Sequence, residues 1–280
     1  MNGTFPKWLK IVLIFFVFGL VRSPFESSLR KQMQETRMLL PTPGHSAMAQ
    51  MGQSALMGLL GGVRTLVATG YLFDSYRHFD NDDWDANRKS LLLATYLEPT
   101  VESHWVDLVW HRGINAPAWL ETRSTLPEIE KRILYHEYTR DAIELGEAGL
   151  KNLPDSVEIR KQMSEVYKEK IKDPCGTARM YKEILELKNA PMYASRFYGY
   201  YLADCPGRER DAYEHLVNLY WEGKQNHLPT LLKKILTLQE ELDIPMPLWI
   251  PEKDPDARKA VNRRFEKRNR ILPGGIRLPW

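Results

Sequence analysis

The chain has 280 residues, of which 43% are hydrophobic and 27% are charged, and its formal net charge is +3. These values are ordinary for a folded protein of one or two domains, and they exclude a chain too polar to form a core. The charge is unevenly distributed, because residues 258–270 hold seven basic residues and one acidic residue. The carboxyl-terminal tail is therefore the basic part of the chain.

Residues 1–24 are predicted to be a membrane anchor. An unbroken apolar run, Ile11 to Val21, follows Lys7, Trp8 and Lys10. A helix over the 16 residues 8–23 would span about 24 Å, less than the bilayer core of about 30 Å. Lys10 can extend toward the headgroups and Trp8 suits the interface, so crossing is still expected.

Two other interpretations of residues 1–24 stay open. A cleaved signal peptide has an apolar run of this length, but Pro24 would follow the nearest cleavage site. The segment is also compatible with a buried helix of a soluble protein. We expect a single-pass anchor in a bacterial-type inner membrane, with the rest of the chain on the periplasmic side.

Residues 25–54 are predicted to form a juxtamembrane helix and a linker, since Pro41-Thr42-Pro43-Gly44 blocks regular structure. A second apolar run, Ala55 to Phe73, contains Arg64 and several glycines. As a second membrane span it would bury the arginine at a cost of about 3 kcal/mol. We predict instead the first helix of the folded domain, with glycines at close packing points; a second span or a membrane-lying helix is the alternative.

Val157 to Pro191 has the clearest pattern of two facing helices. The first helix, Val157 to Lys172, carries one apolar stripe at helical spacing, made of Ile159, Met163, Val166 and Tyr167. Asp173 is the expected N-cap of the second helix, Pro174 fits its first turn, and this helix is expected to reach about Lys188. A helix pair of this kind buries its stripe only against neighbouring pairs.

Similar positions recur along the chain in one register. They include Leu91, Ala94 and Pro99; Trp105 and Leu108; Ala142, Gly149 and Pro154; Met163 and Tyr167; Thr177 and Tyr181; Gly199; and Ala212 and Leu216. Over residues 68–226 this pattern resembles the 34-residue tetratricopeptide repeat, and the chain is also similar to uncharacterised membrane-anchored repeat proteins of bacteria. The resemblance implies an all-α solenoid of about four helical hairpins, within a repeat domain at residues 55–244.

The repeats are interrupted and closed by two further segments. The second unit measures 55 residues from Pro99 to Pro154, and the extra residues lie within Gly113 to Ile133. They form either a functional loop or the start of a long helix that begins at Pro127 and reaches Leu153. Leu228 to Leu242 is predicted to be a capping helix, followed by a proline-rich and basic tail at residues 245–280.

In the tetratricopeptide family the first helices line a concave face that binds peptides or protein segments. The resemblance therefore implies a non-enzymatic scaffold with a protein or peptide partner. Its binding residues would be Tyr76, Trp110, Lys161, Glu165, Arg196 and Tyr200. Aromatic side chains supply area and charges supply direction at such a surface. The alternative is that Tyr76 and Trp110 pack in the core between units.

Few residues suggest catalysis or metal binding. The acidic loop of Asp80, Asp82, Asp83 and Asp85 lacks the glycine and glutamate of a calcium loop, so these residues are expected to cap and solvate a helix turn. His136-Glu137 lacks the second histidine of a zinc-protease helix. We predict no metal and no cofactor. An envelope enzyme would need a site in the acidic loop or near His104 and His111.

Two features bear on compartment and partners. Cys175 and Cys205 are predicted to be unpaired thiols in equivalent loops of stacked units, which lie about 10 Å apart, although an exported protein would permit a bridge. Arg263, Arg264, Lys267 and Arg268 in the tail are candidates for binding lipid or nucleic acid. Nucleic acid is disfavoured because Phe265 is the one aromatic residue beside them. The oligomeric state stays open.

Overall fold

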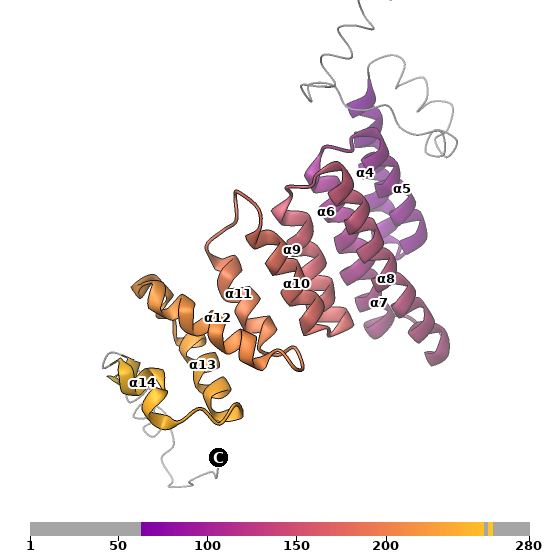
Figure 1. The fold of residues 1–280 in the computed structure, drawn as a ribbon. Helices are drawn as coiled ribbons and strands as arrows, with labels where there is room; N and C mark the ends of the chain where they lie inside the picture. Colours follow the sequence, from indigo (N-terminus) through magenta and orange to yellow (C-terminus); the bar gives the residue numbers. More distant parts are fainter. Residues whose placement is uncertain (1–62, 255–256, 260–280) are drawn as a thin grey trace, which may run out of the picture.

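The computed structural model describes residues 63–254 and 257–259, and this part of the chain consists of helices and connecting turns without a strand. The predicted all-α class is confirmed. The longer helices follow one another in a row (Figure 1): α4 (Arg64–Asp80), α5 (Trp84–Leu97), α6 (Glu102–Trp110), α7 (Ala116–Thr122), α8 (Glu128–Asn152), α9 (Val157–Val166), α10 (Pro174–Leu185), α11 (Tyr193–Leu202), α12 (Glu209–Glu222), α13 (Pro229–Glu241) and α14 (Ile250–Lys253).

Short helical segments join these elements. They are the π-helical turns η1 (His111–Asn115) and η2 (Tyr167–Ile171) and the 3₁₀ turns η3 (Lys224–Asn226) and η4 (Met246–Leu248). The predicted anchor at 1–24, the linker at 25–54 and the basic residues Arg263, Arg264, Lys267 and Arg268 lie outside the described residues. Among the helices that the structure does describe, none combines the length and the apolar character needed to cross a membrane.

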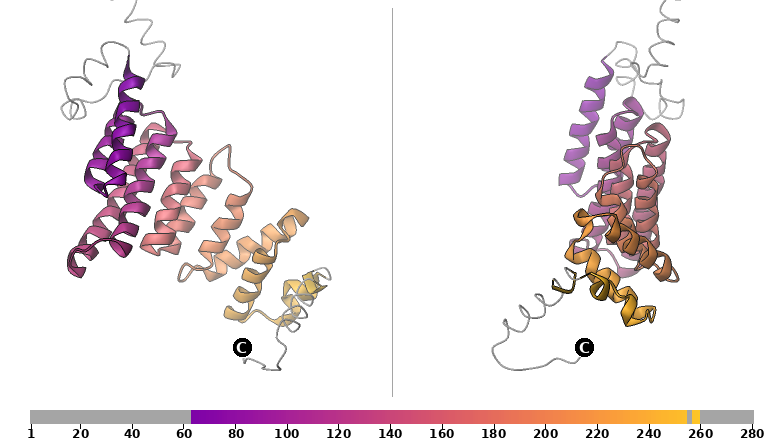
Figure 2. Two further views of the ribbon diagram at one scale, coloured as in Figure 1. Left: turned by 180° about the vertical axis from the view of Figure 1, so that it is seen from behind. Right: turned by 60° about the vertical axis from the view of Figure 1, so that its left-hand side comes forward.

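The helices pack mainly on their neighbours in the chain. α4 packs on α5, α6 on α8, α9 on α10, and α11 on α12, while α13 packs on α12. Contacts of α6 with α9 and of α10 with α11 join one pair to the next. Figure 2 shows the same succession from behind and from the side. The fold is a row of antiparallel helix pairs, and each pair shares its buried surface with the pairs beside it.

The recurring sequence positions lie in the buried core. α6 begins at Glu102, and Trp105 and Leu108 are 2% and 0% exposed. The matching positions of the other pairs are also buried, namely Leu91, Ala94, Ala142, Met163, Tyr167, Thr177, Tyr181, Ala212 and Leu216. Helical periodicity therefore identified the packed face of these helices correctly.

Helix starts follow the predicted capping chemistry. The Asp173 carboxylate accepts a hydrogen bond from the Gly176 amide at 2.9 Å, and Pro174 opens α10 where no amide hydrogen is needed. Lys172, which precedes Asp173, has φ 59°, a left-handed conformation that ends the helical run of α9 and η2. The predicted break at Asp173-Pro174 is confirmed. The helical run before it ends at Ile171 and α10 ends at Leu185, ahead of the predicted Lys172 and Lys188.

The extra residues of the second unit are mostly helical. η1 and α7 follow α6 directly, and Pro127 is the N-cap of the 25-residue α8, which ends at Asn152. The interpretation of a long helix starting at Pro127 is confirmed. These residues thicken the first half of the row instead of forming a long open loop.

The glycines differ in their surroundings. A Cβ at Gly199 of α11 would lie 2.4 Å from Leu216 of α12, so glycine is needed for this close contact. A Cβ at Gly70 of α4 would meet nothing within 4 Å. The expectation of close packing at Gly70 is therefore wrong. The predicted helix Ala55 to Phe73 is also shifted: the described part of it belongs to α4, which continues to Asp80.

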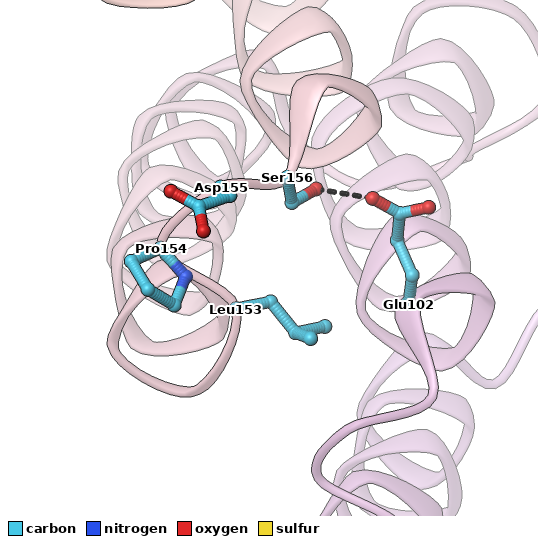
Figure 3. A pocket seen from close by; sticks show the side chains of 5 residues that line it. All are labelled: Glu102, Leu153, Pro154, Asp155 and Ser156. Carbon is cyan, nitrogen blue, oxygen red and sulfur yellow. Dashed lines mark hydrogen bonds between the residues drawn. The ribbon is translucent and has the colours of Figure 1, made fainter. Parts of the chain in front are cut away.

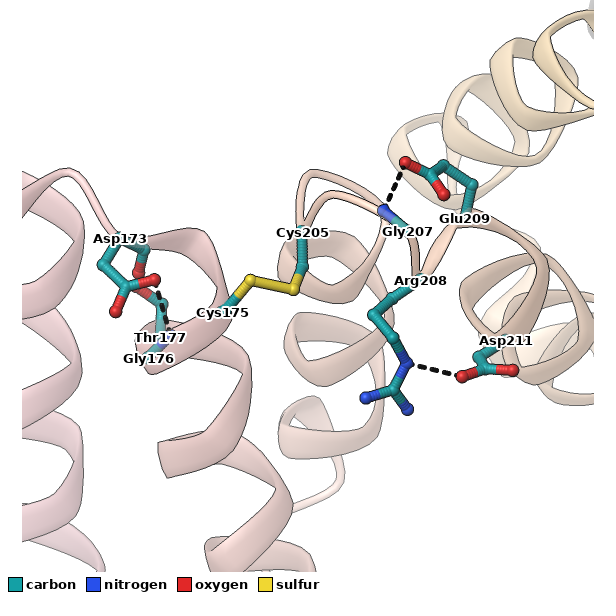
Figure 4. The surroundings of a disulfide bond; sticks show 9 residues. All are labelled: Asp173, Cys175, Gly176, Thr177, Cys205, Gly207, Arg208, Glu209 and Asp211. Carbon is teal, nitrogen blue, oxygen red and sulfur yellow. Dashed lines mark hydrogen bonds and ion pairs between the residues drawn. A yellow bond between two sulfur atoms is a disulfide. The ribbon is translucent and has the colours of Figure 1, made fainter.

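Cys175 and Cys205 form a disulfide, so the prediction of unpaired thiols is wrong (Figure 4). Cys175 lies in the first turn of α10, whereas Cys205 follows the end of α11. The two loops are not equivalent, because α11 packs directly on α10 and runs back toward its start. Their Cα atoms are 4.9 Å apart, within the range of about 7 Å that a bridge requires.

Candidate protein-binding surface

A cluster of five aromatic side chains, Tyr181, Tyr193, Phe197, Tyr200 and Tyr201, lies where α10 meets α11; we call it the aromatic cluster. Phe197 is at its centre, with ring centroids 5.3 Å from Tyr181, 5.6 Å from Tyr193, 6.1 Å from Tyr200 and 6.4 Å from Tyr201. The rings of Tyr181 and Tyr201 are stacked at 5.8 Å. Such pairs add about 0.5–1.5 kcal/mol beyond the area they bury.

Helical spacing on α11 produces the cluster. Tyr193, Phe197, Tyr200 and Tyr201 stand at i, i+4, i+7 and i+8, so their side chains leave α11 on one side. Phe197 remains 37% exposed, and Met192, the N-cap of α11, is 73% exposed. The cluster is thus anchored in the fold by its tyrosines and presents an apolar centre to solvent.

Charged side chains of α9 and η2 border the aromatic cluster. The Lys161 ammonium donates to Glu158 at 2.8 Å, which raises the pKa of Lys161. Lys168 contacts Glu169 at 2.8 Å and Glu165 at 3.5 Å, and its pKa is raised by the hydrogen bond to Glu169. Both lysines are therefore charged at neutral pH, and both belong to ion pairs that leave part of the side chain in solvent.

Burial keeps Tyr181 and Tyr201 of the cluster protonated. Burial raises the pKa of Tyr181 to about 12; a hydrogen bond with Ser164 lowers it, while the charges of Tyr201 and Glu165 add to the rise. Burial also raises the pKa of Tyr201, against the opposing charge of Lys168. These influences place the hydroxyl ends of the cluster beside the α9 charges. The surface therefore combines neutral aromatic rings with adjacent charges of both signs.

The structure brings together four of the six predicted binding residues. Lys161 and Glu165 lie on α9 next to the aromatic cluster, and Arg196 and Tyr200 belong to α11. The charge of Arg196 influences Tyr200, whose pKa is raised by burial. Tyr200 itself is 9% exposed, and its hydroxyl is buried without a hydrogen-bond partner in the described part of the chain.

Tyr76 and Trp110 lie apart from this surface. Tyr76 on α4 is 56% exposed and Trp110 at the end of α6 is 41% exposed. The alternative that both pack in the core between units is contradicted. Within residues 63–254 neither ring makes an aromatic contact with the cluster.

Sequence reasoning missed Phe197, Tyr193 and Tyr201. The signal was present, since these residues repeat at i, i+4 and i+8 with Tyr193 first. The repeat register predicted Arg196 and Tyr200 as binding residues instead, because the register assigns only one or two positions of each first helix to the binding face. The aromatic cluster depends on Tyr181 of α10, against which Phe197 and Tyr201 pack.

The acidic loop has structural roles. Asp83 caps α5 by accepting from the Ala86 amide at 3.1 Å, and Asp82 pairs with Arg123 at 2.9 Å. Asp85 contacts Arg112 at 2.8 Å. The expected capping role is confirmed for Asp83, whereas Asp82 and Asp85 pair with arginines of other segments. The described residues hold no group of side chains suited to a metal ion.

Arg112 is the centre of a buried ion network that joins α5, η1 and α8. Its side chain is 4% exposed; it donates to Asp141 at 2.7 Å and lies 4.0 Å above the ring of Tyr138. Arg88 donates to the same Asp141 at 2.6 and 2.8 Å. Burial alone would raise the pKa of Asp141, but the hydrogen bonds and charges of Arg88 and Arg112 outweigh it, so the pKa is lowered.

The histidines are used within the fold. His104 is buried and contacts Glu98 at 2.9 Å, and Glu98 also accepts from the Thr65 hydroxyl at 2.7 Å. Burial lowers the pKa of His111, which lies 3.1 Å from Asn115. His104 therefore links α6 to the end of α5, and the His111–Asn115 contact lies within η1.

Ser195 and His215 form the closest approach to a nucleophile and base. Nε2 of His215 is 3.2 Å from the Ser195 hydroxyl and 2.9 Å from the Ser195 carbonyl oxygen. Because a carbonyl accepts only, Nε2 must carry a proton, and it is then not free to take the proton of the hydroxyl. This pair ties α11 to α12 and is not arranged as an activated serine.

A small pocket of about 280 Å³ opens between the start of α6 and the α8–α9 turn (Figure 3). Its lining is Glu102, Leu153, Pro154, Asp155 and Ser156. The Ser156 hydroxyl donates to Glu102 at 2.6 Å and accepts from the Ile159 amide at 3.0 Å, as the N-cap of α9. The polar groups of the pocket therefore fasten one helix pair to the next.

Comparison with family models, with curated proteins and with solved structures finds no match to this chain. Function must therefore be argued from the geometry and the sequence.

Proposed function

We propose that this chain is a non-enzymatic, membrane-anchored scaffold whose helix pairs form a tetratricopeptide-like solenoid, and that it binds a protein or peptide partner at the aromatic cluster. The observation that carries the proposal is the half-exposed Phe197, held by four tyrosines and bordered by Lys161 and Lys168. A bound segment would bury the ring of Phe197 at little entropy cost, and the charges would fix its direction.

The spacing of the helix pairs supports the repeat assignment. α9 begins at Val157, α11 begins 36 residues later at Tyr193, and α13 begins another 36 residues later at Pro229. These intervals are close to the 34 residues of a tetratricopeptide unit. In this arrangement α9 and α11 are the first helices of consecutive units, and they are the helices that flank the aromatic cluster.

The disulfide supports the proposed location. Bridges such as Cys175–Cys205 form and persist in oxidising compartments, as in the bacterial periplasm, and are rare in the cytosol. Together with the apolar segment in residues 1–24, this favours a repeat domain on the outer side of an inner membrane. Reporter fusions after Trp280 test the side: activity of a reporter that works only in the cytoplasm would contradict it.

A capture experiment tests the binding surface. Full-length wild-type protein and the Phe197→Ala variant are cross-linked in cells and the captured proteins are compared. We expect Phe197→Ala to lose the partner while its helical content, measured by circular dichroism, stays unchanged. Met192→Ala serves as the control at the edge of the surface, where a smaller loss is expected. Full capture by Phe197→Ala would remove the aromatic cluster as the binding site.

Tyr200 provides a control for the same surface. Its buried hydroxyl lacks a partner among the described residues, so removing it in Tyr200→Phe is expected to maintain or raise the stability of the free protein. Because the hydroxyl is buried, a segment bound at the surface does not reach it, so Tyr200→Phe is expected to leave partner binding unchanged and is a control for Phe197→Ala. Weaker binding by a protein of equal or greater stability would place Tyr200 at the contact; unchanged binding would assign it to the core alone.

A further inference from the structure

One side of α4 is apolar and solvent-exposed at the start of the helix row. Val63, Leu66 and Phe73 are 44%, 70% and 71% exposed, and a Cβ at Gly70 would meet nothing within 4 Å. The opposite side of α4 packs on α5 through Ala68, Leu93 and Leu97. We call residues 63, 66, 70 and 73 the α4 stripe. It is separate from the aromatic cluster and does not depend on the function proposed there.

The spacing of the α4 stripe is that of a helix–helix seam. Its positions are separated by three, four and three residues. A narrow stripe of this kind is typical of helices that pair with one other helix, whereas a wider apolar face is typical of helices packed in a domain.

The stripe is complementary to itself. Phe73 is a large, exposed side chain. Gly70, one turn earlier, has no side chain and open space around it, and so leaves a hole in the stripe. An antiparallel second copy, related by a two-fold axis between these two residues, would bring each Phe73 over the Gly70 of the other copy. The same operation would place Leu66 opposite Arg77 of the other copy. The aliphatic part of an arginine side chain can cover apolar surface of this kind.

We propose that the chain forms a homodimer through an antiparallel pairing of the α4 stripe with the α4 stripe of a second copy. The charges on α4 favour this occupant over a lipid surface. α4 has no lysine, its Arg64 is partly buried near the charge of Glu98, and its Arg77 is paired with Asp74. Helices that lie on membranes instead have a polar face rich in free basic residues.

The size of the stripe indicates a reversible dimer. Phe73 and the neighbouring Tyr76 are each more than half exposed. Since an aromatic side chain buries about 150–250 Å², two copies of the stripe with its flanks would cover on the order of 1,000 Å², the lower end for a specific interface. A micromolar dissociation constant is expected, and confinement of both copies to one membrane would raise their effective concentration.

Sedimentation of the full-length chain in a mild non-ionic detergent, over a range of protein concentrations, tests the proposal. We expect a monomer–dimer equilibrium for the wild type. Phe73→Glu should weaken it at least tenfold, because the two-fold axis brings the two new carboxylates close together. Leu66→Glu should weaken it as well, because it removes apolar surface from the seam. Ile129→Glu is the matched control, since Ile129 on α8 is also an apolar residue with 64% of its surface exposed. The dimer of this variant should have the same dissociation constant as the wild-type dimer.

Gly70→Leu separates dimerisation from folding. The new side chain fills the open space and suits a helix better than glycine, so thermal stability of the monomer should not fall. The same side chain occupies the hole for Phe73, so the dimer should weaken. A stable Gly70→Leu protein with impaired dimerisation would support the proposal in a way that general unfolding would not.

Three results would overturn the proposal. The first is a wild-type chain that is monomeric at every concentration. If Leu66→Glu then also lowers thermal stability, the stripe is covered by a contact within the chain. The second is a dimer that is unaffected by Phe73→Glu and Leu66→Glu. The third is an unchanged mass combined with quenching of a fluorophore at position 66 by lipid-borne quenchers, which would assign the stripe to the membrane.

Discussion

Two regions of the helix row are held together by different physical means. In the first, α5, η1 and α8 meet around the buried Arg112, whose partners are Asp141, Asp85 and Glu137. In the second, α10 and α11 meet through the aromatic cluster and the Cys175–Cys205 bridge. The first region is stabilised by ion pairs between charged groups that have little access to water. The second region is stabilised by apolar contact and by a covalent bond.

This difference bears on where function can be located. A buried ion network fixes geometry, because loss of one charge leaves its partner desolvated and unpaired. Aromatic contact tolerates an additional ring or apolar group at its exposed edge, because the attraction has little directional demand. Of these two regions, the second is therefore the better suited to the partner binding proposed above, while its disulfide limits how far α11 can move.

The largest expected effect is loss of the disulfide. Replacing both cysteines, Cys175→Ser with Cys205→Ser, frees a loop whose ends are separated by 30 residues. Chain entropy predicts a decrease in the free energy of unfolding of about 3–4 kcal/mol. Chemical denaturation measures it, and hydrogen exchange should increase at α10 and α11 but not at α5 and α8. Reduction of the wild type should reproduce the result; faster exchange in α8 instead would show that the two regions are not independent.

A similar but slightly smaller loss is expected in the first region. Asp141→Asn removes the carboxylate that Arg88 and Arg112 share, and the side chain of Arg112 is only 4% exposed. We expect a decrease in the free energy of unfolding of about 3 kcal/mol. Glu144→Gln on the same helix is the control, because its pair with Arg140 is exposed and should be worth less than about 1 kcal/mol. Equal effects of the two variants would contradict a special role for the network.

The pH dependence should separate the regions further. The pKa of Asp141 is lowered in the folded protein from its ordinary 3.8 by Arg88 and Arg112, whose effects outweigh that of burial. Its contribution to stability is therefore fully present above pH 4 and is lost as the pH falls through the lowered pKa. The difference in unfolding free energy between wild type and Asp141→Asn should be constant from pH 7 to pH 5 and shrink below pH 4. A difference that grows in acid would reverse the assigned sign.

The smallest effect is expected at Tyr200. Tyr200→Phe removes a buried hydroxyl without a hydrogen-bond partner in the described chain, so the free energy of unfolding should stay within about 1 kcal/mol of the wild type, on the stabilising side. Calorimetry at one protein concentration measures it. Phe197→Tyr is a useful comparison, because the added hydroxyl lies on the exposed ring and should be neutral. A loss of more than about 2 kcal/mol in Tyr200→Phe would show that the hydroxyl has a partner.

Much of the helix arrangement was predictable because helical periodicity and capping are local. Trp105 and Leu108 marked the buried side of α6, Asp173 marked the start of α10, and Pro127 marked the start of α8. The candidate site was predictable only in part. Lys161 and Glu165 were found from the register, whereas Phe197 gains its significance from Tyr181, which lies 16 positions away and on another helix.

The sequence by itself determined the all-helical class, many of the buried positions, the break at residues 173–174 and the apolar and basic ends of the chain, because each depends on neighbours within a few residues. Tertiary structure decided the pairing of Cys175 with Cys205, the burial of Arg112 and the open space at Gly70. These depend on how far apart two helices settle and on which end of one meets which end of the next. Residue spacing in the sequence constrains such distances only weakly, because the distance and angle between two helices depend on all the side chains along their contact.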